Sequence, residues 1–196
     1  MLDISDTTQD AKLTLFIEQA SAKIAQYLGY PVKRATYTDE KYAINNQQIL
    51  MLRSQPLQSV TSVSIAGVAV TDYELSPDDM AIGCIFRGTG WCGNYYVRGL
   101  APDPVSGFRD IKITHVSGWY LPGDALYVKD DPSSLPIGIS TAATEAVVER
   151  YRINMISAEG LKAHSEGGIS DTFGDNIGLS QRIRDDLAVW KKWTVA

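Results

Sequence analysis

The strongest constraint on the fold is a change in the spacing of apolar residues near residue 30. Over residues 13–28 apolar side chains recur at intervals of three and four, which is the period of an amphipathic helix. From Tyr37 to His115 the period falls to two, and β-branched and aromatic residues become frequent, as is typical of strands. The sequence therefore predicts an α+β fold.

The first helix is predicted over residues 7–28. Asp6 is placed to cap its start, with Gln9 three residues later as the partner in an approximate capping box. Gly29 and Pro31 end the helix at Leu28, because glycine favours the left-handed turn after a helix and proline cannot continue one.

A β unit is predicted over residues 36–116. Glycine and proline interrupt it every eight to twelve residues, which favours a small antiparallel sheet or a barrel-like unit. Asn45-Asn46 suits a tight hairpin turn between the first two strands, and Gly67 suits a turn after the third. The predicted strands are 37–42, 48–53, 60–65, 68–73, 82–86, 95–98 and 110–116. Residues 99–107 and 118–136 are rich in proline, glycine, aspartate and serine, and we expect loops there.

A second helix is predicted over residues 140–158, with Ser140 as its cap. Its apolar face should pack on the first helix, so that residues 1–159 form a single α+β domain made of a small helical bundle and an inserted sheet. We expect core or subunit contacts from one set of side chains: Phe16, Ile17, Ile24, Val147 and Tyr151.

The remaining residues, 160–196, are predicted to be a flexible glycine-rich segment followed by a helix that Ser180 caps. That helix has an apolar side and a basic side. Two interpretations stay open, because an amphipathic stripe usually faces its own core, whereas aromatic and arginine side chains beyond a tether are typical of an interface anchor. The candidate docking residues are Ile183, Leu187, Trp190, Trp193, Arg182 and Arg184.

Composition excludes several classes of function. The 196 residues carry 18 Lys and Arg against 23 Asp and Glu, a net charge of −5, and proteins that grip nucleic acid usually show a basic excess. The sequence contains no apolar run of 18 residues, so we expect no membrane-spanning helix. Its first residues are acidic and polar, so we expect no secretory signal. Cys84 and Cys92 lack the spacing of a zinc site, and we expect packed, reduced thiols with a local disulfide as the minor option.

No motif in the sequence predicts catalysis, a metal or a cofactor. The glycines between residues 83 and 93 do not follow a phosphate-loop pattern, and no nucleophile elbow or zinc-protease helix occurs. The paired carboxylates Asp78-Asp79 and Asp130-Asp131 lack calcium-loop spacing. A hydrolase would need a pocket that joins His115 to carboxylates and a reactive side chain.

An ordered series of phrases resembles a known family. These phrases are Y-L-G-Y-P at residues 27–31, T-Y-T at 36–38, L-x-L-R-x-x-P-L-x-S-V-T-S-V at 50–63, I-K-I-T-H-V-S-G-W at 111–119 and A-A-T-E-A-V-V-E-R-Y-R at 142–152. In this order they resemble the head-to-tail connector proteins of long-tailed bacteriophages, also called the head-completion or adaptor family. The resemblance covers about residues 10–155, and a cysteine-bearing, glycine-rich insert at 83–107 departs from it.

The resemblance implies a structural protein without an active site. Family members form a ring, expected here to be a dodecamer, beneath the portal protein at the neck of the virion, after assembly in the host cytoplasm. The ring extends the channel through which DNA passes and offers a surface to the stopper or tail. The alternatives are another neck component, such as a stopper or tail terminator, and a small phage-encoded hydrolase.

Overall fold

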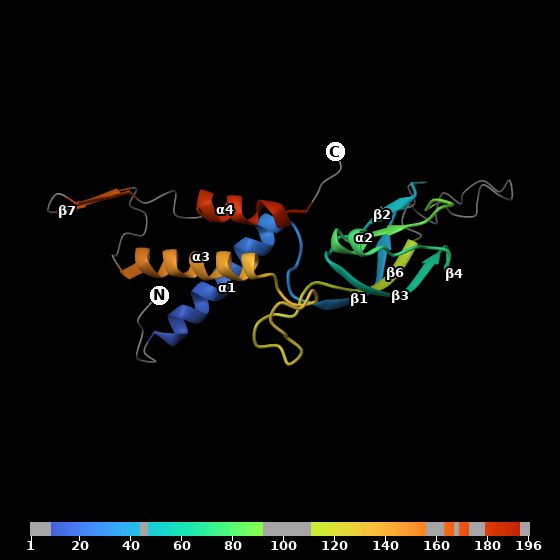
Figure 1. Ribbon diagram of the computed structural model, residues 1–196, viewed down its shortest axis with the longest axis horizontal. Helices are drawn as coiled ribbons and strands as arrows, with labels where there is room; N and C mark the ends of the chain where they lie inside the picture. Colours follow the sequence, from blue (N-terminus) through green and yellow to red (C-terminus); the bar gives the residue numbers. More distant parts are fainter. Residues whose placement is uncertain are drawn as a thin grey trace. The chain divides into compact units, whose positions relative to one another are not determined.

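The computed structural model describes residues 9–43, 47–91, 111–155, 163–166, 169–172 and 179–192 (Figure 1). The chain divides into two compact units. The helical unit comprises Met1–Gly29 and Leu135–Lys192, and the sheet unit comprises Tyr30–Ser134 and Trp193–Ala196. The predicted α+β class is confirmed, because helices and antiparallel strands both form.

Helix α1 of the helical unit spans Asp10–Leu28 and ends as predicted. Gly29 adopts a φ of 84° there, and its N–H donates to the carbonyl of Ala25 at 3.0 Å. Gln9 occupies the N-cap position without a side-chain cap, while Asp6 lies outside the described residues. Every fourth residue of the apolar stripe is buried, namely Phe16, Ala20, Ile24 and Leu28.

Helix α3 spans Ile137–Met155 and begins three residues before the predicted cap Ser140. The carbonyl of Pro136 accepts hydrogen bonds from the N–H groups of Ile139 and Ser140, both at 3.1 Å. Ser140 is therefore inside the first turn and is not the cap. The predicted end at residue 158 lies outside the described residues.

Helix α4 spans Gln181–Leu187 and continues into the 3₁₀ helix η2, Ala188–Trp190. Ser180 is its N-cap residue as predicted, although its hydroxyl donates to Glu149 of α3 at 3.1 Å instead of capping the helix. In the same unit β7, Ala163–Glu166, pairs antiparallel with β8, Ile169–Thr172.

Helix α4 and the residues just after η2 are tied to α1 within the helical unit. The hydroxyl of Tyr27 donates to the carbonyl of Arg184 at 2.8 Å, and the N–H of Lys192 donates to the carbonyl of Leu28 at 2.9 Å. We predicted a single domain over residues 1–159 and left open whether the C-terminal helix packs on its own core or on a partner. The contacts group α4 with α1 and α3 in one compact unit, in which α4 buries Ile183 and Leu187.

The sheet unit holds a four-stranded antiparallel sheet in the order β1-β6-β3-β4 and a smaller pair, β2-β5. The strands are β1 Ala35–Tyr42, β2 Ile49–Met51, β3 Leu57–Ile65, β4 Val68–Ala69, β5 Cys84–Phe86 and β6 Ile111–Ser117, with the short helix α2 at Pro77–Ala81. The core cluster of this unit is Tyr42, Leu50, Leu52, Leu57, Val63, Ile65, Ile85, Trp91, Ile111 and Ile113.

The two turn predictions have opposite outcomes. At Ala66-Gly67 both residues have positive φ, 50° and 79°, and Ile65 pairs with Val68, so the predicted hairpin after the third strand is confirmed. Asn45-Asn46 lies outside the described residues, but the predicted pairing of the two strands that flank it is wrong, because β1 pairs with β6 and β2 pairs with β5. The predicted strand at 95–98 lies outside the described residues.

The predicted loop between β6 and α3 is held by its own hydrogen bonds. The N–H of Tyr120 donates to the carbonyl of Ser133 at 2.9 Å and closes the base of the loop. Inside it, Asp124 accepts from the N–H of Leu121 at 2.7 Å, and the Ser134 hydroxyl accepts from the N–H of Val128 at 3.1 Å. Such internal bonding gives a long loop a defined shape.

Candidate functional site

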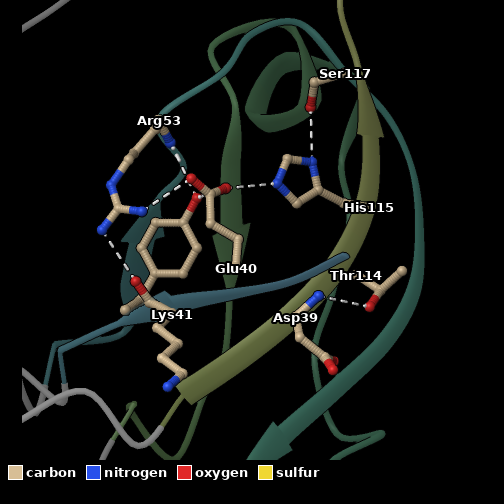
Figure 2. A network of polar contacts seen from close by, with 8 residues as sticks. Asp39, Glu40, Lys41, Arg53, Thr114, His115 and Ser117 are labelled. Atoms are coloured by element: carbon tan, nitrogen blue, oxygen red, sulfur yellow. Dashed lines mark hydrogen bonds and ion pairs between the residues drawn. The ribbon is translucent and has the colours of Figure 1, made fainter. Parts of the chain in front are cut away.

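A network of polar side chains, mostly buried, lies in the sheet unit (Figure 2). His115, on the central strand β6, is fully buried. Its Nδ1 lies 2.9 Å from Oγ of Ser117, and its Nε2 lies 3.0 Å from Oε2 of Glu40 on β1. In the tautomer that carries the proton on Nε2, the imidazole donates to the carboxylate and accepts from the serine hydroxyl.

Glu40 is the hub of this network. Besides His115, the hydroxyl of Tyr42 donates to Oε2, and Nη1 of Arg53 donates to Oε1 at 2.9 Å. Burial raises the pKa of Glu40, but the hydrogen bonds from Tyr42, His115 and Arg53 outweigh it, so the pKa lies below its ordinary value. Burial, followed by the bond to Glu40, raises the pKa of the Tyr42 phenol well above its ordinary range.

A bulge in β1 brings Glu40 to His115. The β1-β6 register shifts between Tyr37 and Glu40, and Asp39 in the bulge adopts a φ of 50°. The N–H of Asp39 donates to Oγ1 of Thr114 at 3.1 Å, which satisfies a backbone group that the bulge removes from the ladder. On the near side of the bulge the Tyr37 ring stacks on the imidazole, with centroids 5.0 Å apart.

The order serine, histidine, carboxylate resembles a hydrolytic triad, which is the arrangement that a hydrolase would require. A nucleophilic serine must reach a substrate, however, and Ser117 is only 1 % exposed while His115 is 0 % exposed. The carboxylate is also engaged by Tyr42 and Arg53. The network is therefore suited to holding β1 against β6 and not to attacking a substrate.

The glycine-rich segment after β5 contains an arginine that is already paired. Arg87 donates to the Asp72 carboxylate at 3.0 and 3.1 Å and to the carbonyl of Gly90 at 3.0 Å. Its guanidinium also lies 5.9 Å from the ring of Trp91. The Arg87 guanidinium is therefore already bonded within the chain, whereas a phosphate site in this segment would need it to bind the ligand.

Metal chemistry has no support in the part of the chain that the structure describes. No group of three His, Cys, Asp or Glu side chains gathers there to hold a metal ion. Cys84 is buried, whereas Cys92 lies outside the described residues. Among the described helices, none is long and apolar enough to cross a membrane.

The predicted core residues of the helical unit fall into two groups. Phe16, Ile24 and Tyr151 are buried, and Val147 is half-buried. Ile17 is 53 % exposed and Leu15 on the same helix is 49 % exposed, so α1 keeps aliphatic side chains outside the core.

The predicted docking residues also divide. Ile183 and Leu187 are fully buried and serve the core of the helical unit, so they are not available to a partner in this structure. Trp190 is half-buried, Arg182 and Arg184 are exposed, and Trp193 lies outside the described residues. The exposed side of α4 also carries Asp185 and Asp186, so it is mixed in charge and not purely basic.

Sequence reasoning missed the network around Glu40 and the exposed aliphatic side chains of the β6-α3 loop, Leu126 and Val128. The alternation of Glu40 with Tyr42 on one strand is the local signal for a shared face. The partner His115 is 75 positions away, and no spacing rule connects it to them.

Comparison with known proteins shows which family and which folds the chain resembles. The family described as head completion protein (HCP) matches residues 1–93, just under half of the chain. No curated protein matches. Among solved structures, a chain in the neck of a native GTA particle computed with C12 symmetry has a TM-score of 0.55 at 16 % identity, over 95 % of this chain and 85 % of that chain.

Two further structures have the same fold. A chain in the neck of an empty GTA particle computed with C6 symmetry has a TM-score of 0.50 at 18 % identity, over 95 % of this chain and 81 % of that chain. A chain in the virion of a native gene transfer agent particle has a TM-score of 0.50 at 16 % identity, over 100 % of this chain and 86 % of that chain. These chains are parts of the neck or of the virion of such particles. The resemblance of this chain to the head-completion family is thereby confirmed, through the family match over residues 1–93 and the fold that it shares with neck proteins.

Proposed function

We propose that this chain is a head-to-tail adaptor that forms a closed ring of identical copies beneath a portal protein. The observation that carries the proposal is the fold shared with a neck protein over 95 % of the chain, together with the match to head completion proteins. The symmetry of that neck, C12, supports a ring of twelve copies. The ring would extend the DNA channel and offer a surface to the stopper or tail.

The net charge fits passage of DNA. With 23 acidic against 18 basic residues, the chain does not favour the phosphate neutralisation that traps a duplex. We propose that acidic side chains are enriched on the surface that faces the channel. Binding of a DNA duplex to the isolated chain should be negligible at physiological salt, and tight, salt-dependent binding would contradict this part of the proposal.

Contacts between copies require two different complementary surfaces, because a ring of identical subunits is built from heterologous contacts. The half-exposed Ile17 and Leu15 of α1 are candidates in the helical unit. Leu126 and Val128, in the hydrogen-bonded loop of the sheet unit, are 65 % and 60 % exposed and are candidates there. Burial of these exposed aliphatic side chains by a neighbouring copy would stabilise the contact between the two copies.

Portal docking is assigned to the exposed side of α4 and η2. Arg184 projects from α4, Val189 of η2 is 82 % exposed, and Trp193 follows them in the sequence. Deletion of residues 179–196 would not test this docking, because it also removes the buried Ile183 and Leu187. The sharper variant is Arg184→Glu, with Arg152→Glu on the exposed side of α3 as its matched control.

The experiment is to mix the purified chain with its portal ring and measure particle mass by mass photometry, with cryo-electron microscopy of the product. We expect twelve copies on one portal face, weaker binding for Arg184→Glu and unchanged binding for Arg152→Glu. A chain that ignores the portal but binds the end of a tail tube would be a tail terminator. A chain that binds only a portal already carrying an adaptor would be a stopper.

A further inference from the structure

We propose that Arg53 closes the open edge of strand β1 and so prevents a second copy of this chain from adding its own β1 to the sheet. Among the described strands β1 lies at one end of the order β1-β6-β3-β4, with β6 on one side only. An edge strand presents unpaired backbone groups and is a template for pairing with another chain. This inference does not depend on the adaptor function.

The contact that closes the edge is a hydrogen bond to the backbone. Nη2 of Arg53 donates to the carbonyl of Lys41 at 3.0 Å (Figure 2). In antiparallel strands the N–H and C=O of one residue point to the same side. Because Arg53 reaches Lys41 from the side opposite β6, the Lys41 N–H also points to the open edge. An added strand would have to displace the guanidinium to pair at Lys41.

Two further contacts of the guanidinium and two bonds beside it hold it in this place. Nη1 of Arg53 donates to the Glu40 carboxylate at 2.9 Å, and its Cζ lies 5.0 Å from the centre of the Tyr42 ring. The backbone N–H of Arg53 donates to the Tyr42 hydroxyl at 3.1 Å, and that hydroxyl itself donates to Glu40. Because these contacts already fix the planar guanidinium, its bond to the Lys41 carbonyl costs little further side-chain entropy, unlike a bond from a mobile surface charge.

The bulge beside Glu40 adds to the same effect. It interrupts the regular spacing of β1 at Thr38-Asp39, so a second strand could pair regularly only on either side of it. Each side holds only three residues of β1, so a second strand would have to pair on both sides to be held, and Arg53 blocks the side at Lys41. The occupant that best fits this edge, which no described strand covers, is β1 of a second copy, because two β1 strands can pair antiparallel through the same residues.

The test compares Arg53→Ala with Glu40→Gln, which weakens the network but keeps the arginine and an amide oxygen that can accept from its guanidinium. We expect Arg53→Ala to shift to larger species with rising concentration in analytical ultracentrifugation, beyond any assembly of the wild type, and to gain an infrared band of intermolecular strands. When the two variants are compared at the same free energy of unfolding, Glu40→Gln should show neither change. Association of both variants to the same extent would show general destabilisation and would overturn the proposal.

Two additions make the test specific to the edge. Lys41→Pro placed on Arg53→Ala removes the outward N–H and should reverse the association, because proline blocks pairing at an edge. If that double variant does not fold, a synthetic peptide of residues 35–42 replaces it. The peptide should bind Arg53→Ala and not the wild type, and N-methylation at its Lys41 should abolish binding. Equal binding of both peptides, or of peptide to the wild type, would contradict the proposal.

Discussion

His115 Nε2 lies 3.0 Å from Oε2 of Glu40, and this contact joins the middle of β6 to the bulge of β1. The two residues are 75 positions apart, so the bond closes a large part of the sheet unit. With Ser117 and Tyr42 as further partners, the buried donors and acceptors of the pair are satisfied. A buried network of this kind specifies one register, because a slipped register would leave its members unpaired.

Glu40→Gln should reduce the free energy of unfolding at pH 7 by about 1 to 3 kcal/mol, since it removes charge-assisted hydrogen bonds at a mostly buried site. The wild type and the variant should be compared by urea unfolding. Glu74→Gln, at an exposed glutamate outside the network, is the matched control and should change little. An unaltered midpoint for Glu40→Gln would show that the network does not stabilise the fold.

The difference in free energy of unfolding between the wild type and Glu40→Gln should depend on pH. The folded state lowers the pKa of Glu40 below its ordinary value of 4.5, so the carboxylate stabilises the fold above that value. This contribution is lost as the pH falls through the lowered pKa of the folded state. The stability difference between wild type and Glu40→Gln should therefore shrink from pH 7 to pH 3, and a constant difference would contradict the assigned pKa direction.

Local patterns in the sequence were sufficient for the fold class and for most elements. The stripe of α1 and its stop at Gly29 are confirmed, as is the turn at Ala66-Gly67, because each depends on neighbouring residues. Strand pairing depends on residues far apart, and there the predicted pairing of the first two strands is wrong. The turn residues suited a hairpin, but the pairing of β1 with β6 and of β2 with β5 determined the outcome.

The terminal helix shows a second limit of sequence patterns. An apolar stripe at Ile183 and Leu187 has the same spacing whether it covers its own core or a partner, and the structure buries both side chains within the helical unit. The Glu40 network could not be predicted from the sequence for a different reason. Its geometry depends on a bulge in β1, and no residue type in that strand predicts the bulge.

Leu187→Ala should destabilise the helical unit by about 2 to 5 kcal/mol, because it opens a cavity at a fully buried site. Val189→Ala, two residues later and 82 % exposed, should stay within about 0.5 kcal/mol of the wild type. Thermal unfolding, monitored by circular dichroism, gives the melting temperatures of the two variants and so distinguishes a core position from a surface one. Equal melting temperatures would mean that α4 is not part of the core.

Gln19→Leu should stabilise the helical unit by about 1 kcal/mol, because a buried acceptor without a partner costs its desolvation free energy. Oε1 of Gln19, on α1, is buried and has no hydrogen-bond partner among the described residues. Gln26→Leu, at an exposed position on the same helix, controls for helix propensity and should not stabilise. Chemical unfolding of both variants measures the difference, and a destabilised Gln19→Leu would indicate that the amide has a role in packing.

Gly118→Ala and Gly67→Ala should differ strongly although both glycines have positive φ, 96° and 79°. At Gly67 a Cβ would meet nothing within 4 Å, so the cost should be the left-handed conformation alone, about 1 kcal/mol. At Gly118 a Cβ would lie 2.7 Å from the carbonyl oxygen of Lys33, a backbone atom that cannot turn away. Urea unfolding should therefore give a loss of about 3 kcal/mol or more at Gly118. Similar losses at both positions would show that the segment at Lys33 moves to accept the methyl group.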